Sequence, residues 1–169
     1  MAASLDRREF LAAAGGLVVA IAVPAPRAWA AAATPQAGSA PALTPYLAID
    51  PSGAITLFSP TTEMGQGTHT AHALIVADEL GADPARVRVV MPLPADPFRR
   101  GPAQGPRSMA SGGSWGVRAW YTPLRTAAAQ AREMLVAAGA AGLGVEAGTL
   151  EARDGFVHHA ASGRRVGFG

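Results

Sequence analysis

The sequence predicts an α+β fold with two main helices and a short sheet of mixed and antiparallel strands. Residues 68–80 and 117–138 repeat apolar side chains at helical spacing, which indicates two amphipathic helices. Several runs of four to six residues alternate or are apolar between turn signals, as short strands do. The 20 glycines and 14 prolines among 169 residues favour short elements joined by turns over a coiled coil, and the length fits one compact domain.

The first half of the folded region predicts a hairpin followed by a helix and a strand. Residues 46–50 and 54–59 flank the turn sequence Pro51-Ser52-Gly53 and are expected to pair as a β-hairpin. A helix should begin at Thr68 and end at Gly81, because Ala71, Leu74, Ile75 and Asp78, with Leu80 nearby, fall at helical spacing. Residues 86–91 alternate as a strand, so residues 54–91 form a strand–loop–helix–strand unit.

The second half predicts a long helix and a small β region after a loop over residues 92–113. We expect Pro123 to kink this helix or to begin its main portion. Residues 150–153, 156–159 and 165–168 read as strands joined by turns. The apolar stripe of the helix is predicted to contain Val117, Tyr121, Leu124, Ala128, Ala131, Leu135 and Ala138.

Residues 1–30 have the order of segments found in a secretory signal peptide. Arg7-Arg8 precede Phe10 and Leu11, as in twin-arginine leaders, and the apolar run over residues 11–23 is about 20 Å long as a helix against a hydrocarbon core of about 30 Å. Ala28-Trp29-Ala30 provides a small-residue cleavage site. The alternative is an uncleaved amphipathic or membrane anchor. We therefore expect a periplasmic protein, either free or associated with the membrane.

The residues after this leader divide into a linker over 31–45 and a folded domain over 46–169. The linker is rich in alanine, proline and serine, as tethers are. A leader of this type serves proteins that are exported already folded by the twin-arginine machinery. It therefore favours a cofactor that is acquired before export.

Composition excludes several classes of function. All 14 basic residues are arginine, and residues 31–169 hold 11 arginines against 10 acids, so the charge does not favour nucleic acid. Arg99, Arg100 and Arg107 lie close together without interleaved aromatic residues that could stack on bases. The chain has no cysteine, which excludes disulfides, thiolate metal sites and iron–sulfur clusters held by this polypeptide.

Met64-Gly65-Gln66-Gly67-Thr68 lies where the second strand gives way to the first helix. Glycines allow close approach of a ligand to the backbone, and the first turn of a helix offers free N–H groups that favour an anion. Gln66 adds an amide that both donates and accepts hydrogen bonds. The alternative is an ordinary glycine-rich turn in which Thr68 caps the helix.

Ser111-Gly112-Gly113-Ser114 repeats this arrangement immediately before the long helix. Two such turns could hold opposite sides of one extended anionic ligand, provided that the fold brings them together. The alternative is that Ser114 only caps the helix.

Histidines give no metal site by spacing alone. His69 and His72 are three apart on the first helix, but no third ligand is evident among Glu63 and Asp78, so we favour surface or interface histidines. His158 and His159 alternate faces on a strand and cannot jointly hold one ion.

Several motifs together resemble the molybdopterin-binding large subunit of the xanthine oxidase and aldehyde oxidase family. The first is the run Ser59-Pro-Thr-Thr-Glu-Met-Gly-Gln-Gly-Thr-His-Thr-Ala, followed by Ala77-Asp-Glu-Leu-Gly-Ala and Arg86-Val-Arg-Val. Residues 111–114, 117–118, 123–125, 131–135 and 161–165 fit the isoquinoline 1-oxidoreductase beta-subunit branch. The resemblance covers residues 46–169 and implies the N-terminal part of a molybdopterin-binding domain.

The resemblance implies a site for molybdopterin cytosine dinucleotide whose metal is held by the pterin dithiolene rather than by protein side chains. The cofactor-binding roles fall on Met64, Gly65, Gln66, Gly67, Gly113 and Ser114. Gly116 stands where relatives often have a second serine, which removes one hydroxyl donor.

The activity implied is oxidation of an aldehyde or N-heterocycle with water as the oxygen source. Electrons would pass to a small iron–sulfur subunit and then to an acceptor such as a cytochrome. Because the family's large subunits are much longer, the resemblance places the catalytic residues outside these 169 and implies an N-terminal fragment. A non-catalytic exported α+β module that binds an anion or a partner protein is the alternative.

Overall fold

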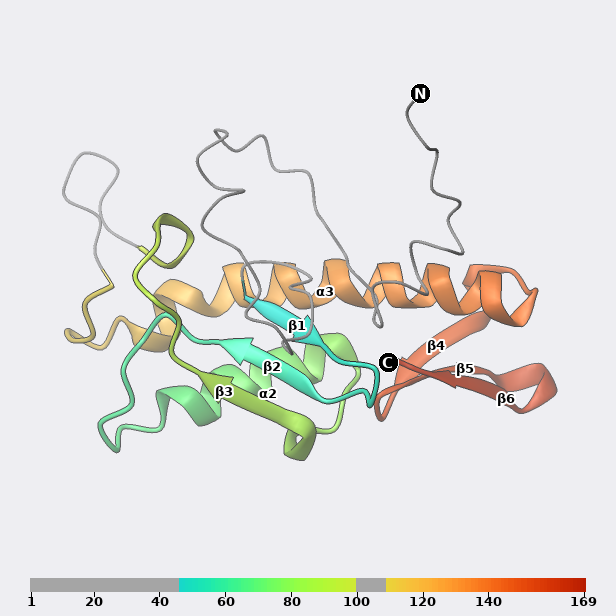
Figure 1. The fold of residues 1–169 in the computed structure, drawn as a ribbon, viewed down its shortest axis with the longest axis horizontal. Coiled ribbons are helices and arrows are strands. Elements are labelled where there is room, and N and C mark those ends of the chain that lie inside the picture. Colours follow the sequence, from blue (N-terminus) through green and yellow to red (C-terminus); the bar gives the residue numbers. More distant parts are fainter. Residues whose placement is uncertain (1–45, 100–108) are drawn as a thin grey trace, which may run out of the picture.

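The computed structural model describes residues 46–99 and 109–169 (Figure 1). The predicted leader and linker, and the loop arginines Arg100 and Arg107, lie outside the described residues. The strands are β1 (Leu47–Ile49), β2 (Ile55–Phe58), β3 (Val87–Val90), β4 (Leu150–Arg153), β5 (Phe156–His159) and β6 (Arg164–Gly167), and the helices are α2 (Thr68–Leu80) and α3 (Gly116–Leu143). This is the α+β fold that the sequence predicts.

The first sheet is mixed and has the order β1-β2-β3. The predicted hairpin is confirmed, because β1 and β2 pair antiparallel with Leu47 opposite Leu57. β3 runs parallel to β2 with Val87 beside Ile55, and α2 makes the crossover between them. The sequence unit of strand, loop, helix and strand is therefore a βαβ unit.

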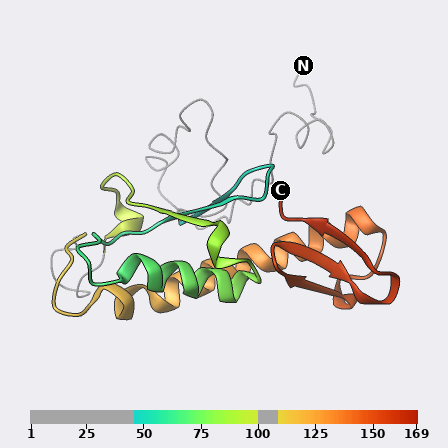
Figure 2. The ribbon, with the colours of Figure 1, turned by 90° about the horizontal axis from the view of Figure 1, so that it is seen from below.

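Both helices pack on one face of this sheet and run in the same direction (Figure 2). The buried core joins leucines and isoleucines of β1 and β2 to Val76 and Leu80 of α2 and to Leu124 of α3. Arg125 of α3 donates to the Glu79 carboxylate of α2 at 2.8 and 2.5 Å, which ties the outer sides of the helices together. Since the helices are parallel, their N-termini lie at the same end of the molecule (Figure 1).

The buried faces of both helices agree with the predicted ones only in part. On α2 the buried residues are Thr68, His72, Val76, Ala77 and Leu80, whereas Leu74 is 51% exposed. On α3 four residues of the predicted stripe are buried: Leu124, Ala128, Ala131 and Leu135. Trp120 is buried in place of Tyr121, which is 46% exposed, and Val117 and Ala138 are also exposed. Trp120 makes an edge contact with Tyr46 of the hairpin, so the sheet selects the tryptophan.

The helix α3 runs through Pro123 from its start at Gly116, so Pro123 does not begin its main portion. Its C-terminal half carries the second sheet, an antiparallel meander of β4, β5 and β6. This sheet is joined to the end of α2, because the Gly155 N–H donates to the Gly81 carbonyl at 3.1 Å. Val157 and Phe168 extend the common core into it. None of the helices in residues 46–99 and 109–169 is long and apolar enough to cross a membrane.

Candidate functional site

The two glycine-rich turns lie side by side at the N-termini of α2 and α3. We call residues 62–68 the α2 corner and residues 111–116 the α3 corner. The backbone N–H of Thr62 donates to Ser111 Oγ at 2.8 Å, which joins the corners directly. A Cβ at Gly116 would be 3.0 Å from Cγ2 of Thr68, so the absence of a side chain at Gly116 allows this close approach. The fold thus brings together the two turns that the sequence singles out.

The side chain of Glu63 closes the α2 corner from within. Its Oε1 accepts hydrogen bonds from the N–H groups of Gly65 and Gly67, and its Oε2 accepts one from the N–H of His69, each at 2.9 Å. The bonds from His69 and Gly67, which hold the charged form, lower the pKa of the Glu63 carboxyl. Gly65 and Gly67 have φ of 92° and 79°, so the chain needs glycine at both positions.

The side-chain amide of Gln66 braces the same turn. Its Oε1 accepts from the N–H of Met64 at 2.6 Å, and its Nε2 donates to the Thr62 carbonyl at 2.7 Å and to Thr68 Oγ1 at 3.0 Å. Both ends of the amide are therefore engaged within the corner. Thr68 in turn lies against Gly116, so Gln66 is linked to the α3 corner through one residue.

The α3 corner turns sharply before its helix begins. Gly113 and Ser114 both have positive φ, of 56° and 57°, and the N–H of Trp115 donates to the Gly112 carbonyl at 3.1 Å. Ser114 is exposed, and the helix starts after Trp115 without a side-chain cap or an acidic residue in its first turn. The first turn of α3 therefore has no acidic residue that could take the place that Glu63 takes in the α2 corner.

A buried hydrogen-bond chain supports the corners from below. His72 is completely buried, its Nε2 lies 3.1 Å from the Gly116 carbonyl, and its Nδ1 lies 3.0 Å from Ser59 Oγ. Since a carbonyl only accepts, Nε2 carries the proton; burial lowers the pKa of His72, so Nδ1 is free to accept from Ser59. Ser59 accepts from Thr61 at 3.1 Å. This hydrogen-bond chain links the end of β2 to α2 and to the start of α3.

Comparison with known proteins identifies the fold family. Residues 16–168 match the sequence model of the molybdopterin cofactor-binding domain. The chain belongs to this family. The resemblance to molybdopterin-binding large subunits is therefore confirmed.

Relatives of this molybdopterin cofactor-binding chain are much longer proteins. It is 36% identical to the isoquinoline 1-oxidoreductase subunit beta of Brevundimonas diminuta over 98% of its own length and 21% of the relative's. It is 34% identical to a membrane-bound aldehyde dehydrogenase [pyrroloquinoline-quinone] of Gluconacetobacter polyoxogenes, over 75% of this chain and 15% of the relative's. The chain thus spans about a fifth or less of these relatives.

A solved structure shares the fold of the molybdopterin cofactor-binding chain. The crystal structure of quinoline 2-oxidoreductase from Pseudomonas putida 86 superposes with a TM-score of 0.52 at 23% identity. The match covers 72% of this chain and 14% of that one.

The geometry of the corners fits a cofactor that is bound through backbone and hydroxyl groups. Cβ atoms at Gly65, Gly67 and Gly112 would meet nothing within 4 Å, so a ligand can approach the backbone there. Every residue predicted to bind the cofactor is exposed in the two corners: Met64, Gly65, Gln66, Gly67, Gly113 and Ser114.

Both capping alternatives are wrong. The N-cap of α2 is Gly67, and Thr68 is the buried first residue of the helix. The N-cap of α3 is Trp115 rather than Ser114. Neither N-cap residue makes a side-chain cap hydrogen bond, and in α2 the amides at the helix start are held by Glu63 instead.

The histidines occupy structural positions. His72 is not a surface residue, contrary to the sequence prediction, and His69 is bonded through Nε2 to the Thr61 carbonyl at 2.7 Å. His158 lies 3.2 Å from the Arg153 carbonyl, and His159 lies 2.7 Å from Ser162 Oγ. Within residues 46–99 and 109–169, no group of three histidine, aspartate or glutamate side chains could hold a metal ion.

Glu63, Ser59 and His72 belong to the site but were not predicted from the sequence as parts of it. His72 could have been found, because it is four residues after Thr68 and four before Val76, on the buried face of the helix. Ser59 and Glu63 belong to the family motif over residues 59–71, but spacing does not reveal their hydrogen bonds.

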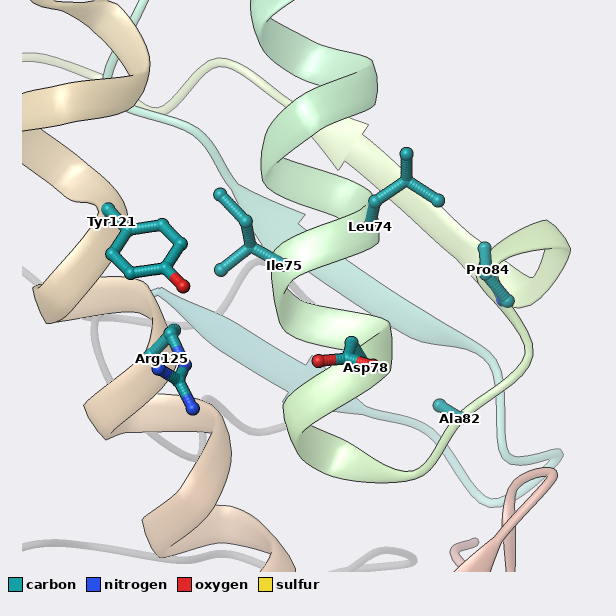
Figure 3. A pocket seen from close by; sticks show the side chains of 7 residues that line it. All are labelled: Leu74, Ile75, Asp78, Ala82, Pro84, Tyr121 and Arg125. Carbon is teal, nitrogen blue, oxygen red and sulfur yellow. The ribbon is translucent and has the colours of Figure 1, made fainter.

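A shallow groove of about 590 Å³ lies elsewhere, between the outer faces of α2 and α3 (Figure 3). Leu74 and Ile75 of α2 and Tyr121 and Arg125 of α3 line it, together with Asp78, Ala82 and Pro84. None of the residues predicted to bind the cofactor contributes to it.

Proposed function

We propose that this chain forms the N-terminal cofactor-binding part of a molybdenum hydroxylase large subunit. The subunit would oxidise aldehydes or N-heterocycles and take its oxygen from water. The named activities of the relatives, an isoquinoline oxidoreductase and an aldehyde dehydrogenase, support this substrate class. Because the chain spans only 21% and 15% of those relatives, the complete activity requires residues beyond those described here.

The adjacency of the two corners carries the proposal. The hydrogen bond from Thr62 to Ser111 joins the corners, and Gly116 lies against Thr68. Two exposed glycine turns therefore lie at neighbouring helix N-termini. One extended ligand with phosphate and polar ring groups can therefore contact both corners at once. Met64, Gly65, Gln66 and Gly67 would hold it from α2, and Gly113 and Ser114 from α3.

The corners have different parts in binding. The amides of Gly65 and Gly67 already donate to Glu63, and both Nε2 hydrogens of Gln66 are donated within the turn. The α2 corner would therefore bind mainly by shape and through the remaining acceptor lone pair of Gln66 Oε1. The α3 corner has an exposed Ser114 and precedes a helix without an acidic residue in its first turn, which favours the anionic groups. When bound, the molybdenum cofactor supplies the redox chemistry, while these residues bind and orient it.

We further propose the cytosine dinucleotide form of the cofactor, a separate small iron–sulfur subunit and an external electron acceptor such as a cytochrome. The name of one relative, a subunit beta, supports a partner subunit. The twin-arginine pattern at Arg7-Arg8 supports export to the periplasm, where the protein would be free or bound to the membrane.

Cofactor analysis tests the proposal. The protein should be isolated from cells that make the molybdenum cofactor and analysed for molybdenum and for nucleotide released by acid. We expect molybdenum and cytidine monophosphate in equal amounts. Pyrroloquinoline quinone without molybdenum, as the name of the aldehyde dehydrogenase relative would indicate for that protein, contradicts the proposal. A protein that holds neither also contradicts it and leaves the non-catalytic module.

A further inference from the structure

Glu63 holds the backbone of the α2 corner in the way that a bound anion would. Three amides, those of Gly65, Gly67 and His69, point at its two carboxylate oxygens, each at 2.9 Å. Successive N–H groups of a glycine turn at a helix N-terminus form a concave site for a phosphate or carboxylate. Here the chain's own carboxylate fills that site.

We infer that Glu63 is a built-in anion that fixes the conformation of the α2 corner and thereby positions Gln66. Positive φ at Gly65 and Gly67 leaves this turn with little intrinsic preference for one conformation, because glycine loses more backbone freedom on folding than other residues. The three bonds to Glu63 span the turn from Gly65 to His69, and so they restrict every residue between them. Gln66 lies in the middle of that span.

The positioning role follows from the bonds of Gln66. Its amide reaches back to Met64 and Thr62 and forward to Thr68, a pattern that requires the turn to be closed. If Glu63 is removed, the amides of Gly65 and Gly67 lose their acceptor and the turn opens. The effect on cofactor binding rests on the proposed function, whereas the bracing of the turn does not.

Replacement of the Glu63 carboxylate by free phosphate gives a test that needs no cofactor. Glu63→Ala removes the carboxylate and leaves the three amides without an acceptor. Inorganic phosphate should therefore bind there and restore stability. Glu63→Gln keeps the size of the side chain but removes the charge and one acceptor, so it should lose stability without recovery by phosphate. Glu133→Ala is the control, because Glu133 has a side chain that is 70% exposed and touches only Arg132 among the described ion pairs.

Thermal unfolding of the full chain is measured in inorganic phosphate and in chloride of equal ionic strength. We expect Glu63→Ala to lower the midpoint by about 4 °C in chloride and to recover in phosphate, whereas wild type and Glu133→Ala shift equally in both salts. If Glu63→Ala does not fold, Glu63→Gln should still unfold below wild type. A Glu63→Ala midpoint equal to that of Glu133→Ala, or a loss with no preference for phosphate, overturns the inference.

Cofactor loading separates this inference from the proposed function. Molybdenum per chain should fall in Glu63→Ala and in Gln66→Ala, and not in Glu133→Ala. Phosphate rescue of Glu63→Ala with molybdenum unchanged in both corner variants supports Glu63 as a built-in anion but contradicts the proposed function. Loss of molybdenum in Gln66→Ala with full loading in Glu63→Ala overturns the positioning role.

Discussion

The hydroxyl of Ser59 lies 3.0 Å from Nδ1 of His72, in the buried space beneath the two corners. This contact connects the end of β2 to the middle of α2, and Nε2 of the same ring reaches the first residue of α3. The three elements that position the corners therefore meet at one imidazole. Disturbance of this ring should affect both stability and the geometry of the corners.

Replacement of His72 by phenylalanine should destabilise the protein by about 2–3 kcal/mol, because Ser59 and the Gly116 carbonyl would lose their buried partner. Chemical denaturation measures the loss. His158→Phe is the control, since His158 lies only partly buried on the second sheet. Equal losses of stability in the two variants would show that the buried hydrogen bonds of His72 stabilise the fold no more than the contacts of His158.

The protein should become less stable as the pH falls below about 6.5. Burial lowers the pKa of His72 in the folded protein, so the unfolded chain binds a proton first and acidification favours unfolding. The stabilisation that neutral His72 provides is complete above pH 6.5 and is lost as the pH falls toward the pKa of His72 in the folded protein. Denaturation at pH 7.5 and at pH 5.5 should give a smaller difference for His72→Gln than for wild type. Parallel pH profiles for the two proteins would refute this assignment.

The close approach of Gly116 to Thr68 predicts that alanine is harmful at the start of α3. A Cβ there would be 3.0 Å from Thr68 Cγ2 and 3.1 Å from its Oγ1, which already accepts from Gln66. We expect Gly116→Ala to cost about 1 kcal/mol despite the better helix propensity of alanine. Gly142→Ala in the same helix, where a Cβ would meet nothing within 4 Å, should instead gain about 0.5–1 kcal/mol. Equal gains in both variants would contradict the close contact.

The joint between α2 and the second sheet should be more sensitive than the end of α3. Gly81 and Gly144 both terminate helices with positive φ, of 72° and 64°. A Cβ at Gly81 would also clash with the backbone carbonyl of Ala152, whereas Gly144 has open space. Gly81→Ala should therefore cost at least about 3 kcal/mol, against about 1 kcal/mol for Gly144→Ala, measured by denaturation.

Local signals predicted the elements well where the chain itself determines them. The turn at Pro51-Ser52-Gly53 gave the hairpin, and Thr68 and Gly81 marked the ends of α2 within a residue. These boundaries depend on backbone preferences of glycine and on turn sequences, which act over a few residues.

Other features depend on contacts that periodicity does not contain. Trp120 and Tyr121 lie four and three residues before Leu124, so either fits the apolar stripe by spacing. Only packing against Tyr46 selects the tryptophan. The bonds of Glu63 depend on the path of a loop, so the sequence indicated an anion site there without revealing that the chain supplies the anion. The prediction of one ligand held by both corners required that the fold bring the corners together. The parallel packing of α2 and α3 does so (Figure 2).

Molybdenum per chain in a Gln66→Ala variant tests the central claim most directly. Gln130→Ala is the matched control, because Gln130 is exposed on α3 away from its N-terminal corner. If the two corners hold one molybdopterin cofactor, Gln66→Ala retains clearly less molybdenum than wild type, and Gln130→Ala retains the same amount. Equal molybdenum in all three proteins, or none in the wild type, would contradict the assignment of the site.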